Sequence, residues 1–224
     1  MIVSEPMSAA FFDLDLTLLR VNSATLWLKF MWRRGELGVM DAVRSVGWLM
    51  QYRMATLDIS DISRKFLTGV AGQSEQEMRE LVAAWYQDEV RQHLYADARA
   101  LVESHRDKGH KLILLTGSSP YISAPVLTEL NLDGFLCTRL EVDDNGLFTG
   151  VPIEPLCFAE GKVHWATRWA ERHGVDLSTS WFYSDSYTDL PMLEAVGHPV
   201  ATNPDPRLRR HAQRAGMQIL DFAD

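Results

Sequence analysis

The chain has 224 residues, of which 46% are hydrophobic and 23% charged, and its formal net charge is −8. This composition is typical of a globular protein with one large domain, or with a domain and a subdomain. The negative charge argues against non-specific binding to nucleic acid or to an anionic membrane. No apolar stretch has the length of a membrane span or the pattern of a signal peptide, so we expect a cytoplasmic protein.

The first segment with a distinct pattern is residues 9–19. Its apolar run from Ala9 to Phe12 predicts a short buried strand, which is followed at once by the carboxylates of Asp13 and Asp15 and by Thr17. Functional groups of α/β proteins gather beyond the carboxyl ends of parallel strands, so the two carboxylates are candidates for cation binding or acid–base chemistry. Taken alone, the motif is better interpreted as a strand followed by an acidic turn.

The pattern then becomes helical from about residue 22 to residue 93. Four helices are expected there, over residues 22–34, 39–54, 58–72 and 75–93. Four helices inserted directly after the first strand predict a small separate bundle. Its aromatic side chains are expected mainly in its own core, with a few lining a pocket that faces Asp13; contact with a membrane surface or a second subunit is a weaker alternative.

The rest of the chain alternates between predicted strands and helices. Strands are expected over residues 111–116, 134–137, 180–183, 198–201 and 217–220, and helices over residues 97–107, 120–130, 161–173, 189–193 and 205–215. This alternation predicts an α/β fold with a mostly parallel sheet covered by helices on both faces. Within residues 139–150, Asp144-Asn145-Gly146 predicts a small β-hairpin with a type I′ turn.

Polar clusters follow three of the predicted strands, and a lysine, Lys162, begins a predicted helix. The clusters are Asp13, Asp15 and Thr17; Thr116, Gly117 and Ser118; and Asp185 and Asp189. If these groups converge, the carboxylates suit a hard cation such as Mg²⁺, while the ammonium, hydroxyl and backbone N–H groups suit a phosphoryl group. One aspartate could then attack phosphorus, and a second could exchange protons with the leaving alcohol and with water.

In order and spacing, these motifs resemble those of the haloacid dehalogenase-like phosphatases, and the resemblance spans almost the whole chain. The stretch from Asp13 to Thr17 is similar to the first motif, Leu115-Thr116-Gly117 to the second, Lys162 to the third, and residues 184–189 to the fourth. The helical insert and the hairpin ahead of the lysine are similar to those of the phosphoserine-phosphatase-like branch. The resemblance implies a three-layer Rossmann-like core of residues 1–20 and 95–224, with a helical cap over residues 21–94.

The resemblance also implies roles for the motif residues. Asp13 would be the nucleophile and Asp15 the general acid and base, while Thr116 and Lys162 would hold the phosphoryl group. Mg²⁺ would be bound by Asp13, Asp15 (through its backbone carbonyl) and Asp185, with Asp189 supporting either the metal shell or Lys162. The residues assigned to substrate binding are Thr17, Asn22, Gly117 and Ser118.

Three residues depart from the family pattern. Leu16 stands where many members have Gly or Asn, and Ser118 where phosphoserine phosphatases often have Gly. Asn22 falls where related caps often carry an acidic residue that recognises a substrate amine. Because Asn cannot supply that charge, phosphoserine itself is in doubt as the substrate.

The resulting hypothesis is a Mg²⁺-dependent phosphomonoester hydrolase that acts on a small phosphorylated metabolite through an aspartyl phosphate. The leading substrate class is the amino-alcohol phosphates, such as histidinol phosphate, phosphoserine or a phosphocholine-like compound. A phosphotransferase or mutase with the same intermediate, and a non-catalytic binding protein on the same fold, are the alternatives. Cap movement would need hinges near residues 20–22 and 93–97, and either a monomer or a homodimer is compatible with the sequence.

Overall fold

The computed structural model describes residues 7–36 and 69–223. The two helices expected over residues 39–54 and 58–72 lie outside these ranges, except for residues 69–72, which form a turn. No helix in the described ranges has the length and apolar character needed to cross a bilayer.

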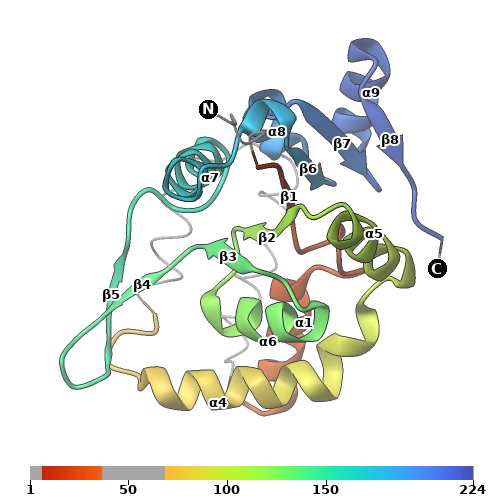
Figure 1. Ribbon diagram of the computed structural model, residues 1–224. Helices are drawn as coiled ribbons and strands as arrows, with labels where there is room; N and C mark the ends of the chain where they lie inside the picture. Colours follow the sequence, from red (N-terminus) through yellow and green to blue (C-terminus); the bar gives the residue numbers. More distant parts are fainter. Residues whose placement is uncertain (1–6, 37–68, 224) are drawn as a thin grey trace.

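A six-stranded parallel sheet forms the centre of the molecule (Figure 1), and its strand order is β3-β2-β1-β6-β7-β8. The strands are β1 (Ala9–Phe12), β2 (Lys111–Thr116), β3 (Gly134–Cys137), β6 (Trp181–Ser184), β7 (His198–Thr202) and β8 (Gln218–Leu220). All four residues of β1 are buried because this strand is paired on both sides, with Phe11 opposite Ile113 on one side and Phe182 on the other. The predicted parallel sheet is confirmed.

Helices cover both faces of the sheet and make it three-layered (Figure 1). Alternate strand residues point to opposite faces, so Phe12 packs into one apolar cluster and Phe11 into the other. The first cluster includes α5 (Ala96–Asp107) and α6 (Pro120–Leu130); the second includes α7 (Glu160–His173), α8 (Leu190–Ala195) and α9 (Pro206–Ala215). The predicted Rossmann-like architecture is therefore present.

The helices inserted after β1 pack through aromatic side chains. Within the described part of the insert these are α1 (Ser23–Arg33) and α4 (Glu75–Trp85), whose Trp27 and Trp85 rings lie 5.0 Å apart, edge to face. The helix expected over residues 75–93 changes form at its end, into a π-helical turn at Tyr86–Val90 and a 3₁₀ turn at Arg91–His93. The two connections to the sheet run side by side, because the N–H of Arg20 donates to the carbonyl of His93 at 2.9 Å.

A two-stranded antiparallel hairpin follows the edge strand β3 and projects away from the sheet (Figure 1). It is formed by β4 (Leu140–Val142) and β5 (Phe148–Pro152). The hairpin is as predicted, but the type I′ turn is wrong. Type I′ needs two successive residues with positive φ, whereas in this turn only Gly146, at +77°, has one. The Asp143 carboxylate accepts from the N–H groups of Asn145 and Leu147, both at 2.9 Å, and this side-chain bonding stabilises a longer loop that ends in the left-handed glycine.

A buried histidine lies between α5 and the sheet. The ring of His105 is 1% exposed; its Nε2 lies 2.6 Å from the Tyr183 hydroxyl and its Nδ1 lies 2.7 Å from Nδ1 of His110. Burial, with further contributions from His110 and Lys108, lowers the pKa of His105 from 6.5 to about 4. His105 is therefore a packing residue.

This histidine predicts a loss of stability in acid. The unfolded chain gains a proton on His105 as the pH falls through 6.5, whereas the folded chain resists protonation down to about pH 4, so acidification across this window favours unfolding. We expect His105→Gln to flatten the dependence of the free energy of unfolding on pH, by about 1–2 kcal/mol between pH 7.5 and pH 4.5. Urea denaturation measures this, with His173→Gln, at an exposed histidine, as control. Parallel curves for wild type and His105→Gln would contradict it.

Candidate active site

The first motif lies just beyond the carboxyl end of β1. The N–H of Asp13 donates to the carbonyl of Tyr183 at 2.9 Å, which extends the pairing of β1 with β6 by one residue. The chain then turns at Leu16, whose φ is +59°. A non-glycine residue in this region is strained, and the Asn203 side chain stabilises the turn by donating to the carbonyl of Leu16 at 3.3 Å. A left-handed backbone conformation is one that Gly and Asn adopt more readily than Leu.

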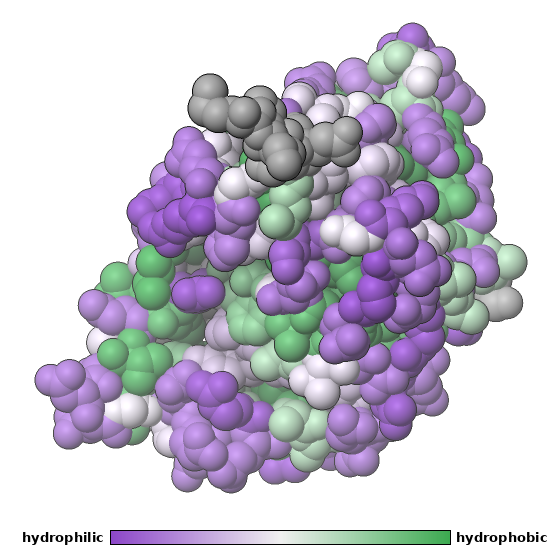
Figure 2. All heavy atoms as spheres, in the orientation of Figure 1, coloured by the Kyte–Doolittle hydropathy of each residue, from purple (hydrophilic) through white to green (hydrophobic). Residues whose placement is uncertain are grey.

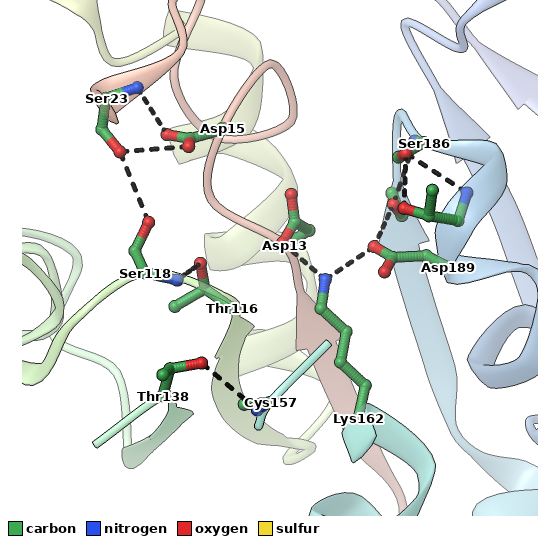
Figure 3. Close-up of polar contacts among 12 residues, drawn as sticks. Asp13, Asp15, Ser23, Thr116, Ser118, Thr138, Cys157, Lys162, Ser186 and Asp189 are labelled. Atoms are coloured by element: carbon green, nitrogen blue, oxygen red, sulfur yellow. Dashed lines mark hydrogen bonds and ion pairs between the residues drawn. The ribbon is translucent and has the colours of Figure 1, made fainter. Parts of the chain in front are cut away.

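Lys162 is the cation at the centre of the site (Figure 3). Its ammonium donates to Oδ1 of Asp13 at 2.7 Å and to Oδ2 of Asp189 at 2.6 Å, and its side chain is only 3% exposed. It comes from the first turn of α7, which packs tightly against the preceding loop. A Cβ at Gly161 would lie 1.8 Å from the carbonyl oxygen of Leu156, so only glycine permits this approach.

The fourth motif follows β6. Ser184, the last residue of that strand, donates its hydroxyl hydrogen to Oδ2 of Asp189 at 2.6 Å, so this oxygen accepts from both Ser184 and Lys162. Asp189 was expected to support either the metal shell or Lys162, and its side chain contacts Lys162. Asp185 is also buried, and its carbonyl accepts from the N–H of Asp205 at 2.7 Å, which ties the loop to the start of α9.

Asp15 has a different environment, at the start of α1 (Figure 3). Its two carboxylate oxygens accept from the backbone N–H of Ser23 at 2.9 Å and from the Ser23 hydroxyl at 3.0 Å. Asn22 donates to Asp15 at 3.3 Å and caps α1 by accepting from the N–H of Thr25 at 3.0 Å. The side chain predicted to read the substrate is therefore engaged in hydrogen bonds within the protein.

The second motif completes the site at the end of β2. The N–H of Ser118 donates to the hydroxyl oxygen of Thr116 at 3.1 Å, and the Ser118 hydroxyl lies 3.4 Å from that of Ser23. Ser23 thus lies between the first and second motifs. The hydroxyl of Thr17 is buried and has no hydrogen-bond partner among the described residues.

The structure therefore joins several of the predicted residues in two groups at the carboxyl ends of the strands, while no side-chain hydrogen bond joins Asp185 or Thr17 to either group among the described residues. Asp13, Lys162 and Asp189 form one group, and Asp15 and Ser118 are joined by Ser23 in the other. Sequence reasoning missed Ser23 and Ser184. Nothing in the position of Ser23 relative to Asp15 indicates a hydrogen bond before the turn at Leu16 is known.

The site holds more carboxyl groups than cationic side chains. Burial raises the pKa of Asp13 to about 7 even though Lys162 lowers it, and burial raises that of Asp15 to about 6 against the hydrogen bonds from Ser23. Burial, reinforced by Asp13 and Asp189, also raises the pKa of Asp185 well above its usual value. Burial alone would lower the pKa of Lys162, but the carboxylates of Asp13 and Asp189 raise it overall, so the lysine stays protonated.

This excess of carboxylates fits a divalent cation. The candidate ligands are carboxylate oxygens, the kind that Mg²⁺ prefers. A bound cation would oppose the burial and the carboxylate repulsion that together raise the pKa of Asp185. Among the described residues, no three carboxylate, thiol or imidazole groups already converge as a metal cluster. In this geometry Asp13 is turned toward Lys162. What fits Mg²⁺ is therefore the chemical nature of the oxygen ligands.

The two carboxylates nearest β1 are prepared for different tasks. Burial brings the pKa of both carboxylates close to neutral, so their contacts distinguish them. Asp13 lies 2.7 Å from the Lys162 ammonium, which favours its ionised form as a nucleophile, whereas Asp15 bonds to Ser23 and can exchange a proton. The arrangement suits attack by one carboxylate and proton transfer by the other.

Comparisons with known proteins agree with this chemistry. The family model described as haloacid dehalogenase-like hydrolase matches residues 10–194. A phosphoserine phosphatase of Mycobacterium tuberculosis is 32% identical over 219 residues, covering 96% of this chain and 71% of its own. A histidinol-phosphatase of Neisseria meningitidis is 29% identical over 217 residues, covering 95% of this chain and 98% of its own. A crystal structure of a Bordetella pertussis protein of unknown function, 32% identical, superposes with a TM-score of 0.87 over 96% of this chain and 98% of its own.

The central lysine predicts a measurable effect on stability. Removing its charge leaves the buried carboxylates of Asp13 and Asp189 without a counter-charge, so Lys162→Met should lower the free energy of unfolding by about 3 kcal/mol in metal-free buffer. The matched control is Lys111→Met, which breaks the exposed pair with Asp133 and should cost less than about 1 kcal/mol. Denaturant unfolding gives both values, and equal losses would contradict the central position of Lys162.

Proposed function

The chain belongs to the haloacid dehalogenase-like hydrolases and is a phosphatase of that family, and from this premise we propose that it hydrolyses a small phosphomonoester through a phosphorylated Asp13. The observation that carries the proposal is the contrast between Asp13, 2.7 Å from the Lys162 ammonium, and Asp15, which is hydrogen-bonded to Ser23 instead. Two neighbouring carboxylates in such different environments are suited to the roles of nucleophile and acid.

In the first step, an oxygen of Asp13 attacks phosphorus and forms an acyl phosphate, while the bond from phosphorus to the ester oxygen breaks. Asp15 gives its proton to the departing alkoxide, which leaves as the alcohol. In the second step, Asp15 takes a proton from water as the water oxygen attacks phosphorus, and Asp13 is released with inorganic phosphate. The pKa of Asp15, about 6, suits both directions of proton transfer.

The phosphoryl oxygens would be held by groups at the carboxyl end of β2 and at the start of α7. Lys162 supplies the fixed charge at the start of α7, and at the end of β2 Thr116 and Ser118 supply hydroxyl donors and Gly117 a backbone N–H. Thr17, whose buried hydroxyl has no partner in the described part of the chain, adds a further donor. Ser23 is assigned to positioning Asp15, because it bonds both carboxylate oxygens.

Mg²⁺ is the proposed cofactor, held by Asp13, Asp185 and the backbone carbonyl of Asp15. When bound, it would neutralise phosphoryl charge and keep Asp13 ionised. Asp189 is assigned to holding Lys162, on the strength of its 2.6 Å contact with the ammonium.

The inserted helices are proposed to form a cap subdomain over residues 21–94, with residues 1–20 and 95–224 as the core. The paired connections at Arg20 and His93 are the natural place for a hinge, because both chain crossings lie together there. Such a cap would exclude water during the reaction and determine the substrate.

An amino-alcohol phosphate is the proposed substrate class. It is supported by the names of the two relatives, a histidinol-phosphatase and a phosphoserine phosphatase. Asn22 is engaged with Asp15 and Thr25, and therefore does not supply the acidic group that would read the amine of phosphoserine. We expect histidinol phosphate to give a higher kcat/KM than phosphoserine; equal values for these compounds and for glycerol phosphate, which lacks the amine, would contradict the class.

Replacing the nucleophile tests the mechanism. Asp13→Asn cannot form a stable acyl phosphate and should lower kcat for 4-nitrophenyl phosphate by at least about 1,000-fold. Asp107→Asn, at an exposed aspartate on α5, is the matched control and should keep wild-type turnover. Thermal unfolding followed by circular dichroism shows whether both variants are folded. Wild-type turnover by a folded Asp13→Asn protein would disprove the proposed nucleophile.

Removing the metal tests the cofactor. Dialysis against EDTA should stop the hydrolysis of 4-nitrophenyl phosphate, because the excess carboxylate charge would then repel the phosphoryl group, and added Mg²⁺ should restore it. Turnover that is unchanged in metal-depleted protein would remove Mg²⁺ from the proposal.

A further inference from the structure

A groove with a volume of about 280 Å³ lies outside the proposed active site, between α7, the edge strand β3 and the β4–β5 hairpin. Helix periodicity explains its position. Lys162, Ala166 and Ala170 form the buried stripe of α7, and the neighbouring stripe, which includes Trp165 and Trp169, lines the groove. Figure 2 shows exposed apolar atoms over the hairpin next to hydrophilic atoms over α7. The groove therefore combines apolar and charged walls.

Three arginines line the groove without carboxylate partners. Arg139, Arg168 and Arg172 make no ion pair with any described residue. Arg79 and Arg99, by contrast, are paired with glutamates at 2.7 and 2.6 Å, while Arg207, Arg210 and Arg214 also make no ion pair with a described residue. The chain has a net charge of −8, yet three guanidinium groups without an ion pair to a described residue line this groove. Such a cluster of positive charge favours the binding of an anion.

The aromatic walls of the groove are held in place before any ligand arrives. Trp165 donates its ring N–H to the carbonyl of Pro155 at 2.7 Å, and Arg168 lies over its ring at 6.0 Å. Trp169 stacks on His173 with centroids 4.4 Å apart and contacts the ring of Phe11 edge to face. Fixed aromatic rings beside guanidinium groups favour a flat aromatic body that carries negative charge, and rigidity lowers the entropic cost of binding it.

We propose that this groove binds a small organic anion that joins a planar aromatic ring to a phosphate or carboxylate group. The ring would lie against Trp165 and Trp169, and the anionic group would lie on Arg168 and Arg172. The volume of the groove is of the order of that of small-ligand pockets. Two copies of the chain paired through this groove about a two-fold axis would bring both sets of arginines together, so charge repulsion disfavours a second copy as the occupant.

The test uses 8-anilinonaphthalene-1-sulfonate, an aromatic anion that no phosphatase hydrolyses and whose fluorescence rises in apolar surroundings. We expect saturable binding to the wild-type protein and at least about tenfold weaker binding to Arg168→Glu/Arg172→Glu. The charge-matched control is Arg79→Glu/Arg106→Glu, at surface arginines outside the groove, which should bind the dye as the wild type does. Circular dichroism confirms that each variant is folded.

Displacement of the dye then identifies the source of the anion. In EDTA buffer, which keeps the proposed reaction from running, AMP represents nucleotides and indole-3-acetate represents aromatic carboxylates. Displacement by either one, but not by adenosine or inorganic phosphate alone, supports the proposal. Equal dye binding by both pairs of variants, or no displacement by either aromatic anion, would overturn it without bearing on the role of Asp13.

Discussion

The structure depends on one buried ammonium among carboxylates. Lys162 contacts Asp13 and Asp189 at 2.7 and 2.6 Å, and it joins three segments that are far apart in the chain: the loop after β1, the start of α7 and the turn after β6. Such a group is costly to desolvate, so it persists only where good geometry and further hydrogen bonds repay the cost, here including the bond from Ser184 to Asp189. Because the carboxylates outnumber the ammonium, the site is suited to binding a cation.

The surrounding fold serves this arrangement through close backbone approaches. Gly161 lets the first turn of α7 lie against Leu156, which delivers Lys162 to the edge of the sheet. Leu16, in the left-handed conformation and hydrogen-bonded to Asn203, turns the chain directly after Asp15. This turn brings the first turn of α1 back to the Asp15 carboxylate. Because α1 also belongs to the proposed cap, Ser23 would link cap position to the protonation and placement of the general acid. Movement of the cap and readiness for proton transfer would then be coupled.

The sequence was most informative where chemistry and strand ends coincide. Asp13, Thr116 and Asp185 could be placed at one edge of the sheet because each follows a short apolar run, and parallel strands bring their carboxyl ends together. Ser23 could not be assigned, since its bond to Asp15 depends on a turn at Leu16 that local propensity disfavours. The hairpin turn was misjudged because the Asp143 carboxylate, not the Asn-Gly pair, determines its backbone.

The central claim is that Asp13 carries the phosphoryl group, and chemical trapping of the intermediate tests it most directly. In Asp15→Asn, 4-nitrophenyl phosphate should still phosphorylate Asp13 because nitrophenolate leaves without a proton, but hydrolysis of the acyl phosphate should be slow without the base. Acid quenching and borohydride reduction followed by peptide mass spectrometry should find homoserine at position 13, and only when substrate was added. No homoserine, or homoserine at another position, would contradict the account.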